Sequence, residues 1–208
     1  MEYVSILAGE PFSDHPECTH AVLAEAARRT NDQLEDWDRH LIVPAIGRLF
    51  GTRADAATDV RLALDLARWA ARSALPKITH PNVRAQCQHL LALDPRTFVI
   101  DDPRIRVIKM HATLYYAGVD SIAYNAAWAT INLLYVQTWY RHATVSPVTI
   151  ISGACAVVAH AFSVFPTGDN GEGALLSGLL DEYDRLTGRT EAHVLTPQEQ
   201  SLLMAVAQ

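Results

Sequence analysis

The chain has 208 residues, of which half are hydrophobic and 19% are charged. This composition can build a sizeable core and excludes an intrinsically disordered protein, and the length favours a single domain. The formal net charge of −6 argues against sequence-independent binding to nucleic acid, which requires a field of Lys and Arg. The three cysteines are scattered and form no disulfide framework, and the first residues contain no signal peptide. Both features predict a cytoplasmic protein.

The first quarter of the chain predicts an arm followed by a long helix. Residues 1–12 are expected to form a short extended arm. Asp14 and Glu17 have the spacing of a capping box, so a helix is predicted to begin at Asp14. Pro44 ends this helix or opens a new one, which finishes at Gly51. Apolar residues recur at intervals of three and four, the pattern of one buried helical face: Leu23, Ala26, Ala27, Thr30, Leu34, Trp37 and Leu41.

The second quarter predicts two further helices. Thr58 is expected to cap the first of them and Pro76 to stop it, with Arg61 and Asp65 forming an i,i+4 pair on its surface. The second begins at Pro81, a residue favoured in the first turn, and ends near residue 94. Residues 96–100 are predicted to be a loop because no partner strand is evident.

The second half of the chain predicts helices with clear starting signals. Asp120 or Ser121, then Ser146-Pro147, and finally the spacing of Thr196 and Glu199 mark three of the starts. The predicted helices cover about 103–117, 120–141, 147–165, 174–188 and 197–206, with a loop at 166–171. The whole pattern predicts an all-α fold, in which residues 13–208 form a single-domain bundle of about eight helices.

Two central segments, residues 121–140 and 142–168, contain no Asp, Glu, Lys or Arg. Each is long enough to cross a bilayer. Polar residues interrupt both segments, however, and no cluster of Lys and Arg flanks them. We therefore expect two central core helices and no association with a membrane.

An aromatic row follows the first uncharged segment: Tyr124, Trp128, Ile131, Tyr135 and Trp139. Aromatic stripes at helical spacing usually pack in the core, and this is the favoured interpretation. The alternative is a pocket for a flat apolar ligand, because Tyr and Trp combine a broad apolar area with a polar tip.

Residues 14–20 bring several metal-capable side chains together. His15, Cys18 and His20 are ligands that zinc accepts, with Asp14 and Glu17 close by. If a helix begins at Asp14, His15 and His20 lie on different faces and cannot converge. A loop that continues past Cys18 could wrap an ion instead. Zinc is thus an available cofactor that the capping-box spacing does not favour.

The same segment allows two non-metal interpretations. Cys18 could be a nucleophile with His15 or His20 as its base, since a helix N-terminus favours the thiolate. The simpler interpretation, which we prefer, is that the histidines cap and pack the helix while Cys18 is a small apolar residue.

The opening Phe12-Ser13-Asp14-His15-Pro16-Glu17-Cys18-Thr19-His20, the Ala-rich helix after it, and Pro44 followed by Gly51-Thr52 resemble uncharacterised helical proteins of high-GC bacteria. The resemblance covers about the first quarter of the chain. It implies no activity, cofactor or site.

These observations favour a small-molecule-binding helical protein, which could be an enzyme of specialised metabolism. Its pocket is expected among the helices of residues 103–165. One alternative is a non-catalytic interaction or oligomerisation module, including a homo-oligomer, with an apolar patch on residues 174–206. A second alternative is a metal-binding protein that uses His15, Cys18 and His20. The expected ligand-binding residues are His111, Tyr115, Tyr116, Tyr124, Asn125, Trp128 and His160.

Overall fold

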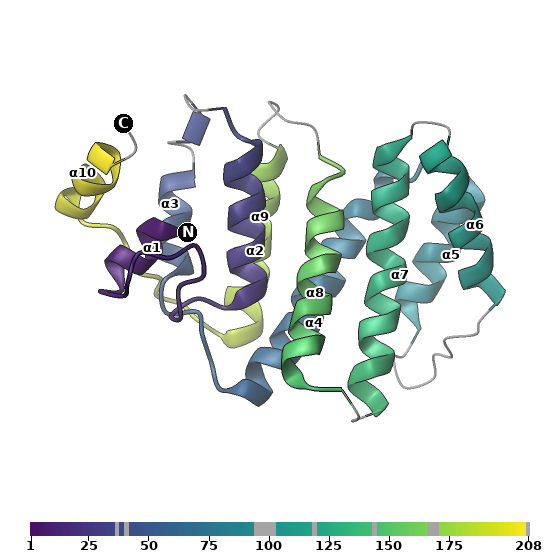
Figure 1. Cartoon of the computed structure of the whole chain (residues 1–208), viewed down its shortest axis with the longest axis horizontal. Helices are drawn as coiled ribbons and strands as arrows, with labels where there is room; N and C mark the ends of the chain where they lie inside the picture. The colour runs from purple at the N-terminus through teal and green to yellow at the C-terminus, as the bar shows by residue number, and fades with distance from the viewer. Residues whose placement is uncertain are drawn as a thin grey trace. The chain divides into compact units, whose positions relative to one another are not determined.

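A computed structural model describes residues 1–35, 38–39, 42–93, 103–117, 120–142, 145–165 and 171–206. Every regular element in this part of the chain is a helix, which confirms the predicted all-α class (Figure 1). Ten α-helices are described there, compared with the eight expected. They are α1 (Glu2–Leu7), α2 (Ala21–Gln33), α3 (Val43–Leu49), α4 (Ala56–Ala74), α5 (Pro81–Ala92), α6 (Pro103–Ala117), α7 (Ser121–His142), α8 (Pro147–Phe162), α9 (Gly171–Thr187) and α10 (Pro197–Val206), and a short 3₁₀ helix, η2 (Leu75–Lys77), follows α4.

The chain divides into two compact units. The terminal unit contains residues 1–59 and 166–208, and the central unit contains residues 60–165. The boundary falls inside α4, directly after Asp59. The single domain expected over residues 13–208 stays a prediction.

The N-terminal predictions need two corrections. Residues 2–7 form the helix α1, with Val4 and Ser5 buried, where an extended arm was expected. The next helix begins at Ala21 and not at Asp14, because the Glu10 carboxylate accepts hydrogen bonds from the backbone amides of Glu17 and Cys18 (2.7 and 2.9 Å). The Glu10 side chain therefore satisfies the Glu17 amide, which Asp14 would have satisfied in a capping box.

The buried stripe of α2 is confirmed, since Leu23, Ala26 and Thr30 are fully buried. The helix is shorter than expected and ends at Gln33, with Leu34 in an extended conformation. Trp37 and Leu41, which were expected to continue the stripe, lie outside the described residues. So do residues 94–102, which include the predicted loop at 96–100, and residues 166–170 of the predicted loop at 166–171, whose last residue, Gly171, begins α9.

Most predicted helix starts in the rest of the chain are confirmed. Ser146 caps α8 by accepting from the Thr149 amide (3.3 Å), and Pro81 opens α5. At α10, Thr196 and Glu199 form the reciprocal capping box, with bonds of 2.7 and 3.3 Å. One exception is α4: its cap is the Asp55 carboxylate, which accepts from the Ala57 and Thr58 amides, and not Thr58 as expected.

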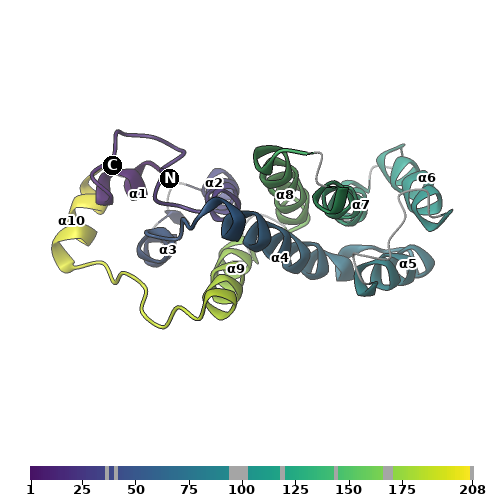
Figure 2. The ribbon, with the colours of Figure 1, turned by 90° about the horizontal axis from the view of Figure 1, so that it is seen from below.

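The central unit is organised around α7, which packs against α6 and α8 (Figures 1 and 2). Small side chains on α7 allow close approach, because Ala123, Ala126 and Ala127 are fully buried. On α8, Gly153 faces Val136 and Trp139 with no room for a side chain. The uncharged residues 121–140 thus form a central core helix, as predicted.

In the terminal unit, α9 packs against α2 and α3 (Figure 1). Its apolar stripe is buried, with Leu176, Leu179 and Leu180 at most 1% exposed. α9 therefore does not present the apolar patch that the oligomerisation alternative predicts on residues 174–206. The α10 side chains beyond Ser201 lie outside the described residues, and a homo-oligomer stays a prediction.

None of the helices in the described part of the chain is both long enough and apolar enough to cross a membrane.

The close approach of α8 to α7 makes Gly153 sensitive to substitution. In Gly153→Ala the new Cβ would lie 2.5 Å from Val136 Cγ2 and 3.4 Å from the Trp139 ring. We expect a loss of about 1–3 kcal/mol in the free energy of unfolding, measured by urea denaturation. Gly173→Ala in α9 is the matched control, because nothing lies within 4 Å of its Cβ, and it should be neutral or stabilising by up to about 1 kcal/mol. Equal effects of the two substitutions would contradict this account of α7–α8 packing.

Candidate functional site

The loop before α2 does not bring its metal-capable residues together. His15 is exposed, and its Nδ1 lies 2.5 Å from Asp14 Oδ1. The Cys18 thiol contacts the Thr19 hydroxyl at 3.6 Å. His20, in contrast, is only 1% exposed.

Both ring nitrogens of His20 are used inside the protein. Nδ1 accepts a hydrogen bond from the Val22 amide (3.3 Å), which makes His20 the cap of α2. Nε2 donates to the backbone carbonyl of Asp59 (3.0 Å). A ring that accepts at one nitrogen and donates at the other is neutral. Burial lowers the pKa of His20 below its usual 6.5, against the opposing effect of Asp59.

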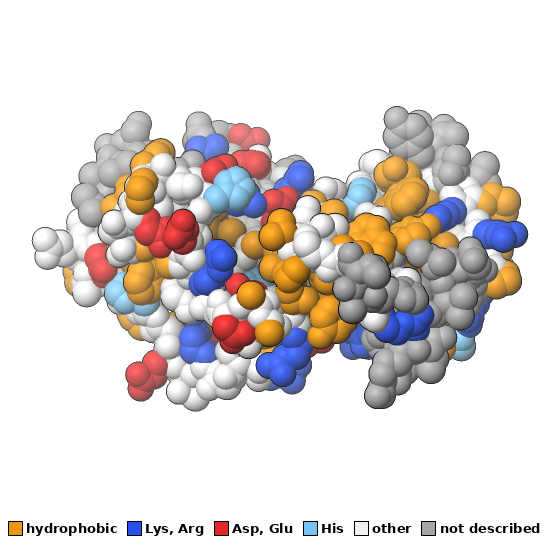
Figure 3. Space-filling view, turned by 60° about the horizontal axis from the view of Figure 1, so that its bottom comes forward, with side chains coloured by type: hydrophobic (Ala, Val, Ile, Leu, Met, Phe, Trp, Pro, Cys, Tyr) orange, Lys and Arg blue, Asp and Glu red, His pale blue; other side chains and the backbone are white. Residues whose placement is uncertain are grey.

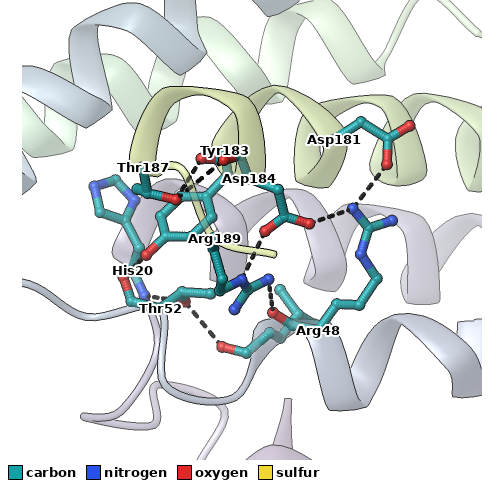
Figure 4. A network of polar contacts seen from close by, with 9 residues as sticks. His20, Arg48, Thr52, Asp181, Tyr183, Asp184, Thr187 and Arg189 are labelled. Atoms are coloured by element: carbon teal, nitrogen blue, oxygen red, sulfur yellow. Dashed lines mark hydrogen bonds and ion pairs between the residues drawn. The ribbon is translucent and has the colours of Figure 1, made fainter. Parts of the chain in front are cut away.

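The capping histidine belongs to a buried polar network of the terminal unit (Figure 4). The Thr52 hydroxyl accepts from the His20 amide (2.9 Å) and donates to the Leu49 carbonyl (2.8 Å). The Tyr183 hydroxyl of α9 donates to the Thr52 carbonyl (2.8 Å). These bonds fasten the segment after α3 to α2 and α9.

A second branch of the network joins α3 to α9 through charge. Arg48 donates to Asp181 and Asp184 (2.7 and 2.8 Å), as Figure 4 shows. Arg189 donates to Asp184 (2.7 Å) and to the Arg48 carbonyl (2.8 Å). The Arg and Asp charges of this branch neutralise one another, so we interpret it as a structural link between α3 and α9.

These contacts argue against a metal site in residues 14–20. Within the described part of the chain no group of three or more His, Cys, Asp or Glu side chains is placed to hold a metal ion. The loop does continue past Cys18, as a metal site would require. Since His20 has no free ring nitrogen, it serves neither as a ligand nor as a base for Cys18. The preferred interpretation, in which both histidines cap and pack the helix and Cys18 is a small buried apolar residue, is correct for His20 alone, because His15 is exposed and Cys18 is only partly buried.

The predicted central residues fall into separate pairs. Asn125 Oδ1 and His160 Nδ1 lie 2.9 Å apart, so α7 and α8 bring these two candidates together. The ring centroids of Tyr124 and Trp128 lie 6.1 Å apart with the planes tilted by 58°, and those of His80 and His111 lie 4.7 Å apart. The side chains of Tyr115 and Tyr116 lie outside the described residues.

The aromatic row is not the core face of α7. Of its five residues only Ile131 is fully buried, while Tyr124, Trp128 and Tyr135 are partly exposed and Trp139 is 37% exposed. Alanines and aliphatic residues supply the core face, because they let α6 and α8 approach closely. The favoured core interpretation is therefore wrong for most of the row.

A cleft of about 190 Å³ opens between α4 and the C-terminal end of α7, and none of the predicted site residues lines it. Its lining combines charged, amide, aromatic and aliphatic groups: Arg61, Leu64, Asp65, Arg68, Gln137 and Tyr140. Gln137 is buried at 7% exposure, whereas the Tyr140 ring is 49% exposed. The cleft is thus polar and cationic on its α4 side and offers a ring on its α7 side.

The cleft arginines differ in how they are held. With the Gln137 amide oxygen turned toward it, Arg68 donates from Nε (3.2 Å) and Nη2 (2.8 Å), so the buried amide fixes its guanidinium. The ion pair expected between Arg61 and Asp65 is not formed, and neither side chain has an ion-pair partner among the described residues. Both residues line the cleft.

The two units carry opposite charge. Residues 60–165 contain ten Lys and Arg, five Asp and no Glu, a formal charge of +5. The terminal unit contains seven Lys and Arg against eighteen Asp and Glu, a formal charge of −11. Where α5, α6 and α7 lie, toward the right of Figure 3, blue Lys and Arg side chains stand among orange hydrophobic ones. The cleft lies in the positive unit, where the field attracts anions.

Comparisons of the chain with family models, curated proteins and solved structures found no match. The resemblance of the N-terminal quarter stays a prediction.

The buried His20 should make stability depend on pH. Because its folded-state pKa lies below 6.5, the unfolded chain binds more protons once the pH falls through 6.5. We expect the free energy of unfolding to decrease from about pH 7 to about pH 5, above the range in which carboxylates titrate. His20→Asn keeps a capping side chain, costs about 1–3 kcal/mol at neutral pH, and should flatten this dependence.

The control for the pH experiment is His15→Asn, which removes an exposed histidine from the same loop. It should leave the dependence unchanged. Urea denaturation over the pH series measures both effects, and an unaltered slope in His20→Asn would contradict the assignment.

Proposed function

We propose that the central unit binds a small anionic molecule in the cleft between α4 and α7. The observation that carries the proposal is that Arg61, which has no ion-pair partner among the described residues, lines the same cleft as Arg68, whose guanidinium the buried Gln137 holds in place. A guanidinium presents a fork of N–H donors that matches a carboxylate. A fixed fork loses less conformational entropy when it binds than a mobile one.

The remaining lining suggests the shape of the ligand. Leu64 and the exposed Tyr140 ring supply apolar area next to the cationic groups. At about 190 Å³ the cleft is smaller than the roughly 300 Å³ at which sites for drug-sized molecules begin. A compact ligand with a carboxylate and one apolar or aromatic group would contact both the cationic groups and the apolar area of the cleft.

Binding fits the lining better than catalysis does. The residues around the cleft include neither a Ser or Cys nucleophile nor a His that could act as its base. The proposal keeps the small-molecule-binding function expected from the sequence, and it replaces the expected binding residues with Arg61, Arg68, Gln137 and Tyr140.

Calorimetric titration with 3-phenylpropionate tests the proposal. The wild-type protein should bind this carboxylate more tightly than its neutral amide, 3-phenylpropanamide. Arg61→Gln should weaken binding of the carboxylate about tenfold, since a charge-assisted hydrogen bond contributes about 1.5–3 kcal/mol. It should not change binding of the amide.

Arg106→Gln is the matched control. Arg106 is also an exposed arginine of the central unit, lies outside the cleft, and changes the charge by the same amount. Its substitution should leave affinity within about twofold, because the field of one distant charge is screened by salt. Equal losses in Arg61→Gln and Arg106→Gln, or equal binding of carboxylate and amide, would overturn the proposal.

A further inference from the structure

We infer that the ligand of the α4–α7 cleft is a zwitterion, an α-amino acid with an apolar or aromatic side chain. This inference rests on the proposed anion site and names its ligand class. It follows from Asp65, a carboxylate that an ordinary anion site would not contain.

The charges on α4 alternate along one face of the helix. Arg61, Asp65 and Arg68 are spaced by four and three residues, so they lie on successive turns and all line the cleft. At a rise of about 1.5 Å per residue, Asp65 stands about 6 Å from Arg61 and about 4.5 Å from Arg68 along the axis. The cleft therefore offers a negative group between two positive ones.

A simple anion would meet a penalty in this arrangement. Its charge would approach the Arg61 guanidinium but would also approach the partly buried Asp65 carboxylate, and like charges at such separations repel. A ligand that also carries an ammonium group converts this repulsion into attraction.

Asp65 is available for that role. It has no ion-pair partner among the described residues, although Arg61 lies at the spacing at which such pairs form. A partly buried carboxylate gains most from a cation brought in by a ligand, because its interaction with bulk water is reduced.

The groups of the cleft then divide into three roles. Arg61 and Arg68 bind the ligand carboxylate, and Asp65 accepts from the ligand ammonium. Leu64 and the Tyr140 ring contact the ligand side chain. The carboxylate and ammonium of an α-amino acid sit on one carbon, and adjacent helical turns present their partners side by side.

Titration of three related probes tests the inference. They are L-phenylalanine, 3-phenylpropionate, which lacks the ammonium, and 2-phenylethylamine, which lacks the carboxylate. The wild-type protein should bind L-phenylalanine about tenfold more tightly than either analogue. Asp65→Asn should remove the preference for L-phenylalanine over 3-phenylpropionate, while binding of 3-phenylpropionate should stay equal or become tighter.

Asp120→Asn is the matched control. Asp120 is a described acid of the same unit outside the cleft, and Asn can replace it as the cap of α7, where Asp120 accepts from the Ala123 amide (2.9 Å). This variant should keep the wild-type preference. If it loses the preference as Asp65→Asn does, the inference is overturned.

The remaining outcomes separate this inference from the proposed function. If 3-phenylpropionate binds as tightly as L-phenylalanine and Arg61→Gln weakens both, the ligand is a plain anion and the zwitterion inference fails alone. If neither compound binds, the anion site itself fails.

Discussion

The central unit depends on covering an uncharged helix. No charged residue occurs between residues 121 and 140, so α7 is stable only if other helices bury most of its circumference. α6, α8 and α5 provide this cover, and the small residues of α7 together with Gly153 let the helices approach. The cover ends at Trp139 and Tyr140, which are exposed. The cleft lies at this end, so its position follows from where the burial of α7 stops.

Because the two units carry opposite charge, the net charge of the whole chain does not describe either unit. An overall charge of −6 argues against a polyanion as partner when the charges are mixed. Here the charge is segregated, and exposed charges act mainly within a Debye length of about 8–10 Å. A small anion in the cleft is affected mainly by the charged residues that line it, Arg61, Arg68 and Asp65, and little by the average over the chain. Binding of a small anion is therefore compatible with an acidic chain.

Helix starts that depend on neighbouring residues were predicted correctly from the sequence. Features that depend on contacts between distant residues were not. The starts of α8 and α10 were predictable because a cap and its amide are only three residues apart. The start of α2 was not, because Glu10 binds the Glu17 amide that Asp14 was expected to cap. The cleft joins Arg61 to Tyr140, and no periodicity relates such distant residues. The sequence feature that indicates a positively charged unit around the cleft is the absence of Glu from residues 60–165. It becomes apparent only when the chain is divided into its two units.

In this protein, structural polar groups differ from candidate binding groups in whether their hydrogen-bond and ion-pair partners lie within the protein. Residues 14–20 have reactive side chains, yet His20 uses both ring nitrogens in holding α2 to the chain around it, so it has nothing left to offer a ligand. Arg61 and Asp65 have the sequence pattern of an ordinary surface ion pair, yet the structure leaves them unpaired in a cleft. Charged groups without a partner in the protein remain able to bind a complementary ligand. Whether a polar group is already paired within the protein is therefore a better guide to ligand binding here than its residue type. By this criterion the expected site lies on α4 and not in the loop before α2.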